Sequence, residues 1–205
     1  SGFGRCLCYR ADLRILGGDR ELVQGFLNGQ SHRTVPGKYL HLSTPVITAI
    51  NGPAAGLGFV IAMSADFRFA KSDAKLSSTF ARLGLIAEYG IAWLLPRLVG
   101  LARASDILIS GRTFTGEQAA EYGLVLTATD DPLAAAYVCA MDLVRNCSPA
   151  SMAVIKAQLV RGMNSEFNES ADDAFVEMGH AFGRGDLAAA LLGKINGVPP
   201  QFPSN

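Results

Sequence analysis

One segment, residues 45–65, constrains the fold more than any other part of the chain. Pro45-Val-Ile-Thr-Ala-Ile50 is β-branched and almost wholly apolar, as expected of a strand that is buried on both faces. Asn51-Gly-Pro-Ala-Ala-Gly-Leu-Gly58 follows as a flexible turn, and residues 59–65 read as the start of a helix that Asp66 ends. A strand, a glycine-rich turn and a helix in this order predict an α/β unit.

The glycine-rich turn is suited to holding negative charge. Gly56 and Gly58 let the backbone approach a ligand closely, because they carry no Cβ. The first amides of the following helix have no partner inside the helix and carry the positive end of its dipole. Nucleotide binding is disfavoured, because Gly52, Gly56 and Gly58 do not follow the G-x-G-x-x-G spacing and no G-K-[ST] motif is present. A turn that only packs a helix on a sheet remains an alternative for this segment alone.

The rest of the chain divides into an irregular start, an α/β middle and a helical end. Residues 1–44 contain turn-forming pairs such as Pro36-Gly37, around one short helix candidate near residues 20–27. Strands are predicted at 67–70, 74–78 and 124–127. Asp66 and Asp73 are interpreted as structural turn or cap residues, and a capping box is predicted at Thr115 and Gln118. Helices are predicted at 90–99 (with Pro96 inside), 102–109, from 115 to about 123, 132–146, 149–162, 169–182 and 187–192. The order predicts an α/β core followed by helices.

Composition excludes several classes of protein. Of the 205 residues 49% are hydrophobic and 18% charged, and the formal net charge of +0 argues against a nucleic-acid binder. Cys6, Cys8, Cys139 and Cys147 have no zinc-binding spacing, so we predict reduced thiols and no metal site. No apolar run reaches the ~18 residues of a membrane span. We therefore expect a cytoplasmic protein.

Four segments together resemble the enoyl-CoA hydratase/isomerase family, also called the crotonase family. Residues 44–58 resemble its strand and oxyanion turn, and Ala65-Asp-Phe-Arg-Phe-Ala70 resembles the helix end and strand that follow. Phe80-Ala-Arg-Leu-Gly-Leu-Ile-Ala-Glu-Tyr-Gly90, with Leu95-Pro-Arg-Leu-Val-Gly100, resembles the active-site loop and the next helix. Residues 111–125 match a further landmark. The resemblance covers about residues 6–162.

The resemblance implies a superhelix of stacked ββα turns with a helical C-terminal region. Residues 1–140 are the expected crotonase-like α/β core, and residues 141–205 the helical region that forms a homotrimer or a dimer of trimers. Because the family's usual first strands and helix have no counterpart and Ser1-Gly-Phe-Gly4 reads like the middle of a protein, we expect that N-terminal elements are missing from this sequence.

The resemblance also implies two backbone amides that hold a thioester oxygen. Carried over by position, they belong to Leu57 and Ala11. Family members usually have glycine before that alanine, so Arg10 is a departure that weakens the first half of the oxyanion hole. Arg14 stands where the family tends to place a basic residue near the coenzyme phosphates, with a solvated surface arginine as the alternative.

The coenzyme-binding set implied by the resemblance combines Arg14 with backbone around the oxyanion positions. Its other members are Ala11, Asp12, Leu13 and Gly56. Asp12 is interpreted as a residue that anchors the backbone rather than as a catalyst. No other cofactor is expected, because coenzyme A arrives as part of the substrate.

The acid and base residues separate this chain from the family's hydratases. The two glutamates that those enzymes use fall here at Val60 and Phe80, which cannot transfer protons and are compatible with an acyl pocket. One carboxylate remains, Glu88, in an apolar setting that raises a carboxyl pKa towards the range of a general base. An N-cap of the helix that follows is the alternative role of Glu88.

Three functions fit these residues, and an enoyl-CoA isomerase is favoured. In an isomerase, Glu88 takes a proton from C2 and returns it to C4 while the Leu57 and Ala11 amides stabilise the enolate. The alternatives are a hydratase that uses Glu88 alone and a non-catalytic acyl-CoA binding protein.

Overall fold

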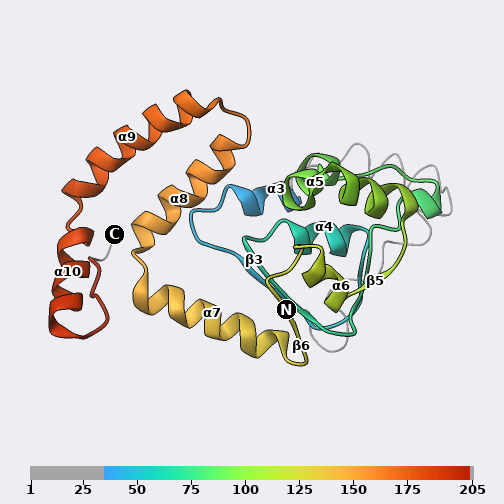
Figure 1. Cartoon of the computed structure of the whole chain (residues 1–205), viewed down its shortest axis with the longest axis horizontal. Coiled ribbons are helices and arrows are strands. Elements are labelled where there is room, and N and C mark those ends of the chain that lie inside the picture. Colours follow the sequence, from blue (N-terminus) through green and yellow to red (C-terminus); the bar gives the residue numbers. More distant parts are fainter. Residues whose placement is uncertain (1–34, 204–205) are drawn as a thin grey trace. The chain divides into compact units, whose positions relative to one another are not determined.

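The computed structural model describes residues 35–203, which divide into two compact units (Figure 1). Residues 35–39 and 46–136 form the first unit, and residues 40–45 and 137–203 the second. The boundary falls inside one helix, α7 (Pro132–Asn146), after Ala136. The described residues do not include Ala11, Asp12, Leu13 and Arg14, nor the helix candidate near residues 20–27. The expectation that N-terminal elements are missing also concerns this part of the chain and stays a prediction.

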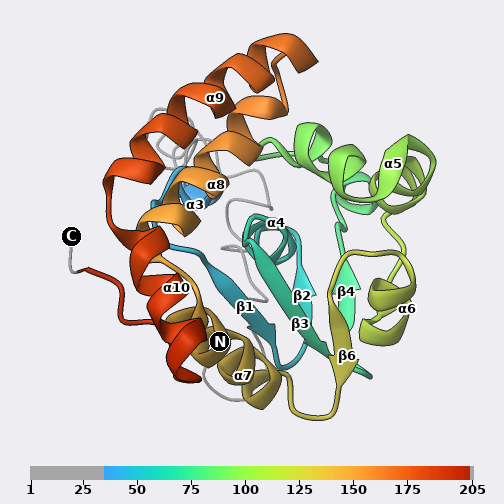
Figure 2. The same ribbon diagram turned by 60° about the vertical axis from the view of Figure 1, so that its left-hand side comes forward.

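The first unit is built from strands that form two small sheets. Its strands are β1 (Ile47–Ile50), β2 (Ala54–Ala55), β3 (Phe67–Lys71), β4 (Lys75–Ser77), β5 (Phe114–Thr115) and β6 (Thr127–Thr129). One sheet has the order β1-β3-β6 and is parallel throughout, and the other has the order β2-β4-β5, with β5 antiparallel (Figure 2). The first two strand pairs, β1 with β2 and β3 with β4, each place one strand in each sheet and are followed by a helix, as expected of stacked ββα turns. In the last turn a helix, α6, separates β5 from β6. The mixed α/β prediction is confirmed.

Helices of the first unit pack their apolar residues against these sheets. They are α3 (Val35–Leu40), α4 (Leu57–Met63), the 3₁₀ turn η2 (Ala81–Leu83), α5 (Ile91–Ser110) and α6 (Gly116–Glu121). The largest fully buried side chains come from several of these elements and form one cluster: Ile50, Phe59, Met63, Leu76, Ile91, Leu95, Ile107 and Leu124. Burying one such side chain stabilises the folded state by about 1.5–3 kcal/mol, and the sum over the cluster is the main contribution that holds the unit together.

Two predicted boundaries were wrong, and one break inside a helix was right. Pro36-Gly37 lies inside α3 instead of in a turn, because proline is tolerated in the first helical turn, where its missing N–H has no partner to lose. Residues 124–126 precede β6 rather than forming the strand, which begins at Thr127 in register with Phe69. The predicted interruption between residues 99 and 102 is confirmed, because Gly100 has non-helical angles (φ 74°, ψ 162°) inside α5.

The second unit is helical, as predicted. It holds most of α7, then α8 (Pro149–Gly162), α9 (Phe167–Gly183) and α10 (Asp186–Asn196), and Figure 1 shows α8 and α9 running in opposite directions. Ser148 caps α8 by accepting the Ser151 N–H (3.1 Å), which confirms the predicted Ser-Pro start. Lys156 is buried and donates to the Thr44 carbonyl (3.2 Å). The assignment of these helices to trimerisation stays a prediction.

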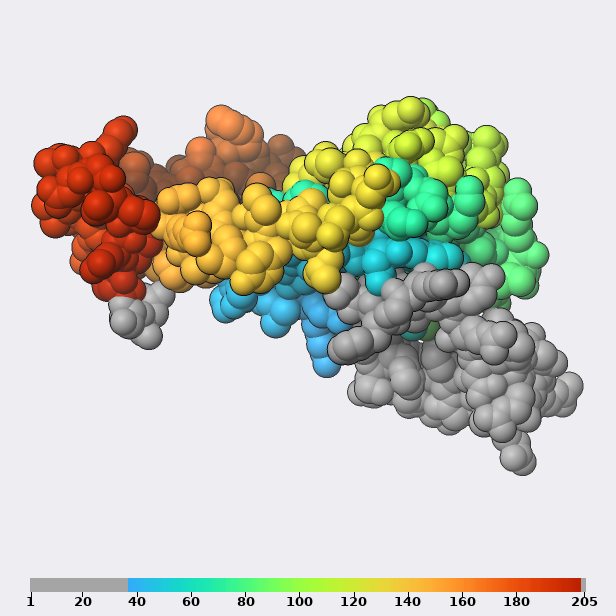
Figure 3. Space-filling view, turned by 90° about the horizontal axis from the view of Figure 1, so that it is seen from below, coloured from blue at the N-terminus to red at the C-terminus, as the bar shows by residue number. Residues whose placement is uncertain are grey.

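Several large apolar side chains of helices α7 and α9 are exposed. No residue of α9 is buried, and Phe175 is 73% exposed. Figure 3 shows α10, in red, at the surface of the second unit. Exposed apolar side chains mark interaction sites in soluble proteins where they form a large patch, so these helices are candidates for such a site.

Candidate active site

The glycine-rich turn leads directly into α4 and leaves an amide unpaired. Gly56 has φ 53° and ψ −121°, which an L-residue adopts only with strain, and its N–H donates to the Ser77 carbonyl (3.2 Å). Helix α4 starts at Leu57, two residues earlier than predicted. No described residue accepts the Leu57 N–H, and the Leu57 side chain is 37% exposed. A first-turn amide in this position can donate to an oxyanion.

The strands on either side fix this turn. Parallel pairing puts Ala55 opposite Ser77, so the end of β2 and the end of β4 lie together. The Asp66 carboxylate accepts the Val46 N–H (2.7 Å), and Arg68 donates to the carbonyls of Leu124 (2.6 Å) and Ala65. The structural role predicted for Asp66 is confirmed, because these bonds join the starts of β1, β3 and β6.

Glu88 lies between η2 and α5 and does not cap the helix. Its carbonyl accepts the Ile91 N–H (3.1 Å), but α5 has Gly90 as its N-cap residue and no side-chain cap. The Glu88 side chain is half-buried, and no hydrogen bond or ion pair joins it to the rest of the described chain. Burial raises the pKa of the Glu88 carboxyl and also the pKa of the neighbouring Tyr89, whose phenolate the Glu88 charge disfavours further. A carboxyl with a raised pKa and no partner within residues 35–203 is suited to accept and return a proton.

Strained backbone lies close to both candidate groups, the Leu57 N–H and the Glu88 carboxyl. Among the described residues, the non-glycine residues with positive φ are Thr79 (57°) and Tyr89 (54°). Tyr89 follows Glu88 directly, and the Thr79 hydroxyl lies beside Gly56, where a Cβ built on that glycine would be 3.6 Å from Oγ1. Strained residues persist where the surroundings over-determine them and cluster at functional sites. Neither residue was singled out in the sequence, since a positive φ has no signature at threonine or tyrosine.

Val60 and Phe80 lie in the hydrophobic cluster rather than on an open surface. They are 1% and 4% exposed, and Ala87 and Tyr89, which flank Glu88, pack against the same cluster. Both positions therefore belong to the cluster on which the two neighbours of Glu88 pack. Their contact with an acyl chain stays a prediction, as do the roles of Ala11, Asp12, Leu13 and Arg14.

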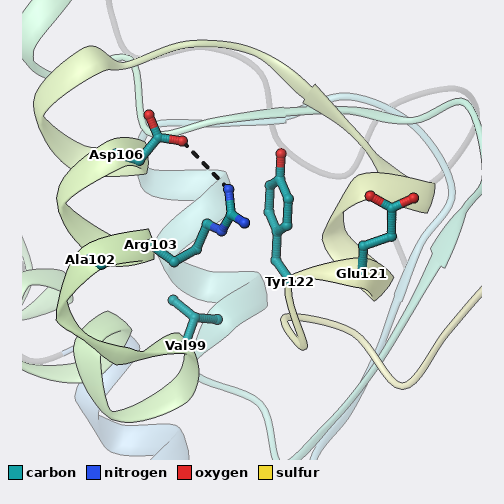
Figure 4. Close-up of a pocket in the computed structure, with 6 residues that line it drawn as sticks. All are labelled: Val99, Ala102, Arg103, Asp106, Glu121 and Tyr122. Atoms are coloured by element: carbon teal, nitrogen blue, oxygen red, sulfur yellow. Dashed lines mark ion pairs between the residues drawn. The ribbon is translucent and has the colours of Figure 1, made fainter.

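A surface hollow of about 480 Å³ lies elsewhere, between α5 and α6 (Figure 4). Arg103 stacks over the Tyr122 ring (4.0 Å to the centroid) and pairs with Asp106 (3.8 Å), which also binds Arg112 (2.7 Å). Arg103 and Asp106 are already paired with each other, and none of the predicted site residues lines the hollow, so we do not assign it to the substrate. Within residues 35–203 there is no group of metal-binding side chains, and no helix is long and apolar enough to cross a membrane.

Comparison with known families and sequences agrees with the resemblance. The sequence model of the enoyl-CoA hydratase/isomerase family matches residues 22–183. Over 90 residues the chain is 43% identical to 1,2-epoxyphenylacetyl-CoA isomerase of Escherichia coli, covering 44% of this chain and 34% of that protein. Over 145 residues it is 36% identical to "Probable enoyl-CoA hydratase EchA14" of Mycobacterium tuberculosis, covering 66% and 53%. The chain thus spans about a third of the first relative and half of the second.

Solved structures show the same fold. An enoyl-CoA hydratase from Bacillus anthracis matches with a TM-score of 0.88 at 27% identity, over 97% of this chain and 77% of that one. An enoyl-CoA hydratase from Polaromonas sp. JS666 matches with a TM-score of 0.90 at 23% identity, over 99% and 80%. The crotonase-like fold class inferred from the sequence is therefore confirmed.

Proposed function

The chain belongs to the enoyl-CoA hydratase/isomerase family, and on this premise we propose that it is an enoyl-CoA isomerase of fatty-acid metabolism. Glu88 takes a proton from C2 of a 3-enoyl-CoA, and the thioester becomes an enolate. The same carboxyl then delivers the proton to C4, so that the double bond moves from position 3 to position 2. One carboxyl group suffices, because it acts first as base and then as acid.

The observation that carries this proposal is the state of Glu88. Its carboxyl has a pKa raised by burial, neither caps α5 nor pairs with a described residue, and is flanked by residues that pack on the apolar cluster. A pKa nearer to the working pH improves a group that must both accept and donate a proton. A relative named as a CoA-ester isomerase also favours isomerisation.

Enolate charge requires donors, and the Leu57 N–H supplies one of them in this proposal. The amide stands at the start of α4, without a described acceptor. Removing a single oxyanion donor commonly lowers the rate ~10²- to 10³-fold. The Ala11 N–H is proposed as the second donor, and Arg14, Asp12, Leu13 and Gly56 as the contacts of the coenzyme portion.

Hydration is the second candidate, because several relatives carry hydratase names. It would require Glu88 alone to activate water, since Val60 and Phe80 replace the pair of glutamates and are buried among apolar side chains. We therefore expect hydration to be slow compared with isomerisation.

The test compares the wild type with Glu88→Gln on 3-enoyl-CoA and 2-enoyl-CoA substrates. Loss of a general base predicts an isomerisation rate ~10²- to 10⁴-fold lower in Glu88→Gln. Glu121→Gln, an exposed glutamate at the end of α6, is the matched control and should keep full activity. Hydration that survives in Glu88→Gln would assign the chemistry to another acid. Tight binding of both substrates without turnover by the wild type would support a non-catalytic binder.

We also propose that the chain self-associates through its C-terminal helices as a homotrimer or a dimer of trimers. The support is the apolar surface of α9 and α10, where Phe175 and Ile195 are 73% and 79% exposed. Phe175→Glu should lower the molar mass measured by light scattering. Asn168→Glu adds the same charge at an exposed polar position of α9 and should leave the mass unchanged. A wild-type monomer would contradict the proposal.

A further inference from the structure

Two buried serines at the end of β4 tie the glycine-rich turn to the far end of α5. The Ser77 hydroxyl donates to the Gly111 carbonyl (2.9 Å), and the Ser78 hydroxyl donates to the Ile107 carbonyl (2.9 Å). Both serines are almost completely buried, so these bonds are shielded from water. The Ser77 carbonyl in turn accepts the Gly56 N–H. The position of the turn therefore depends on this serine pair.

Thr79 continues the run of hydroxyl residues and is held in a strained conformation. Its N–H donates to the Ser77 hydroxyl (3.1 Å), and its own hydroxyl donates to the Ser78 carbonyl (2.8 Å). A positive φ at a β-branched residue is a genuine outlier, because Cβ crowds the backbone. Glycine would take the same angle without strain. The side chain is thus kept at a position where local backbone preference opposes it.

The Thr79 side chain faces the residue that precedes the candidate oxyanion donor. Thr79 Oγ1 is the nearest atom to a Cβ built on Gly56, at 3.6 Å, so the threonine side chain lies opposite Gly56 with room for one methyl group between them. Gly56 immediately precedes Leu57, and its two backbone angles set the direction of the Leu57 N–H. A rotation at Gly56 would turn that N–H away. The bond from the Gly56 N–H to the Ser77 carbonyl opposes such a rotation, and the Thr79 hydrogen bonds to Ser77 and Ser78 hold that carbonyl in place.

We propose that Thr79 is a positioning residue, which fixes the Gly56–Leu57 turn so that the Leu57 N–H points at the thioester oxygen. The inference rests on the proposed function, because it needs the Leu57 N–H to be an oxyanion donor. It adds a residue whose hydroxyl acts through the backbone rather than on the substrate. Small misplacements of a catalytic donor lower rates by factors of up to ~10².

The test uses three substitutions at one position and a control at the other end of α4. Thr79→Val keeps the shape and removes the hydroxyl, Thr79→Gly removes strain and side chain together, and Thr79→Ser keeps the hydroxyl. We expect kcat for isomerisation to fall ~10- to 100-fold in Thr79→Val and Thr79→Gly with KM little changed, and to be largely restored in Thr79→Ser. Ser64→Ala removes the buried hydroxyl that donates to Val60 O (2.8 Å) and should lower the melting temperature without lowering kcat.

A spectroscopic measurement separates this inference from the proposed function. The infrared stretch of a ¹³C-labelled thioester carbonyl should move to lower frequency when an unreactive acyl-CoA binds to the wild type, and move less in Thr79→Val. If the wild type binds and polarises the carbonyl but the Thr79 variants match it in both shift and kcat, the role of Thr79 is wrong and the proposed function stands. If the wild type itself gives no shift, the oxyanion donor is wrong, and the role of Thr79 is overturned with it.

Discussion

Replacing Gly56 by alanine isolates the contribution of the glycine-rich turn. A Cβ at this position would meet only Thr79 Oγ1, at 3.6 Å, which is an ordinary contact, so the substitution carries no steric clash. What remains is the backbone conformation, φ 53° and ψ −121°, which costs an L-residue about 1–3 kcal/mol. If the turn relaxes to an unstrained alternative, this energy lowers the population of the competent turn about 5- to 150-fold. We expect kcat for isomerisation to fall by the same factor.

The assay is steady-state isomerisation of 3-enoyl-CoA, together with thermal unfolding. Gly123→Ala is the matched control, because Gly123 also has a positive φ (77°) and open space around it but lies away from the turn. Both variants should lose stability, while only Gly56→Ala should lose activity. Equal kcat values in the two variants would refute the idea that the turn geometry matters to catalysis. A large loss of activity in Gly123→Ala would show instead that kcat follows stability.

Four further outcomes follow from single residues. Gly116→Ala should destabilise the first unit by about 3–5 kcal/mol in urea unfolding, because a Cβ would lie 2.0 Å from the Lys71 carbonyl oxygen and force α6 away from β3; a neutral result would contradict this packing. Activity should decline as the pH falls through the raised pKa of Glu88, since the base must be ionised. A raised folded-state pKa means that stability from Glu88 is present below its unfolded pKa and lost as pH rises through the folded one. Glu88→Gln should therefore raise the melting temperature at pH 7 but not below about pH 4, and a gain independent of pH would argue against desolvation. Ser148→Ala should weaken α8 by about 1 kcal/mol, seen as faster amide exchange in its first turn, and unchanged exchange there would show that the cap is dispensable.

Elements set by local interactions could be predicted from the sequence. The capping box at α6 forms as expected, with Thr115 N–H donating to Gln118 Oε1 (2.9 Å) and Gln118 N–H donating to Thr115 Oγ1 (3.2 Å). The Asp131 carboxylate likewise accepts the Ala134 N–H (2.9 Å) at the start of α7. In both cases the interacting groups are three residues apart, so a reader of the sequence sees the whole interaction.

Features that depend on distant partners were missed or misplaced. Strand β6 starts at Thr127 because this residue pairs with Phe69. Phe69 lies far away in the chain, so no local pattern specifies that register. The positive φ of Thr79 and Tyr89 has the same origin, since packing rather than residue type holds these angles. At the site, the sequence predicted the glycine-rich turn at Gly56, but it left open whether Glu88 caps α5. The hydrogen bonds from the Ser77 and Ser78 hydroxyls to α5 and its end could be found only in the structure.

The burial of Val60 and Phe80 connects the choice of chemistry with the packing of the core. A hydratase in this family needs two carboxyl groups that reach water and substrate, and an ionised carboxyl at a site as buried as these would be strongly disfavoured. Here the two positions are 1% and 4% exposed and contribute apolar surface to the cluster that also supports Ala87 and Tyr89. Apolar residues at both positions therefore belong to the cluster on which the two neighbours of Glu88 pack, and burial raises the pKa of the Glu88 carboxyl. Apolar side chains at these two positions are therefore compatible with chemistry that uses one carboxyl group and incompatible with hydration by a pair of glutamates there.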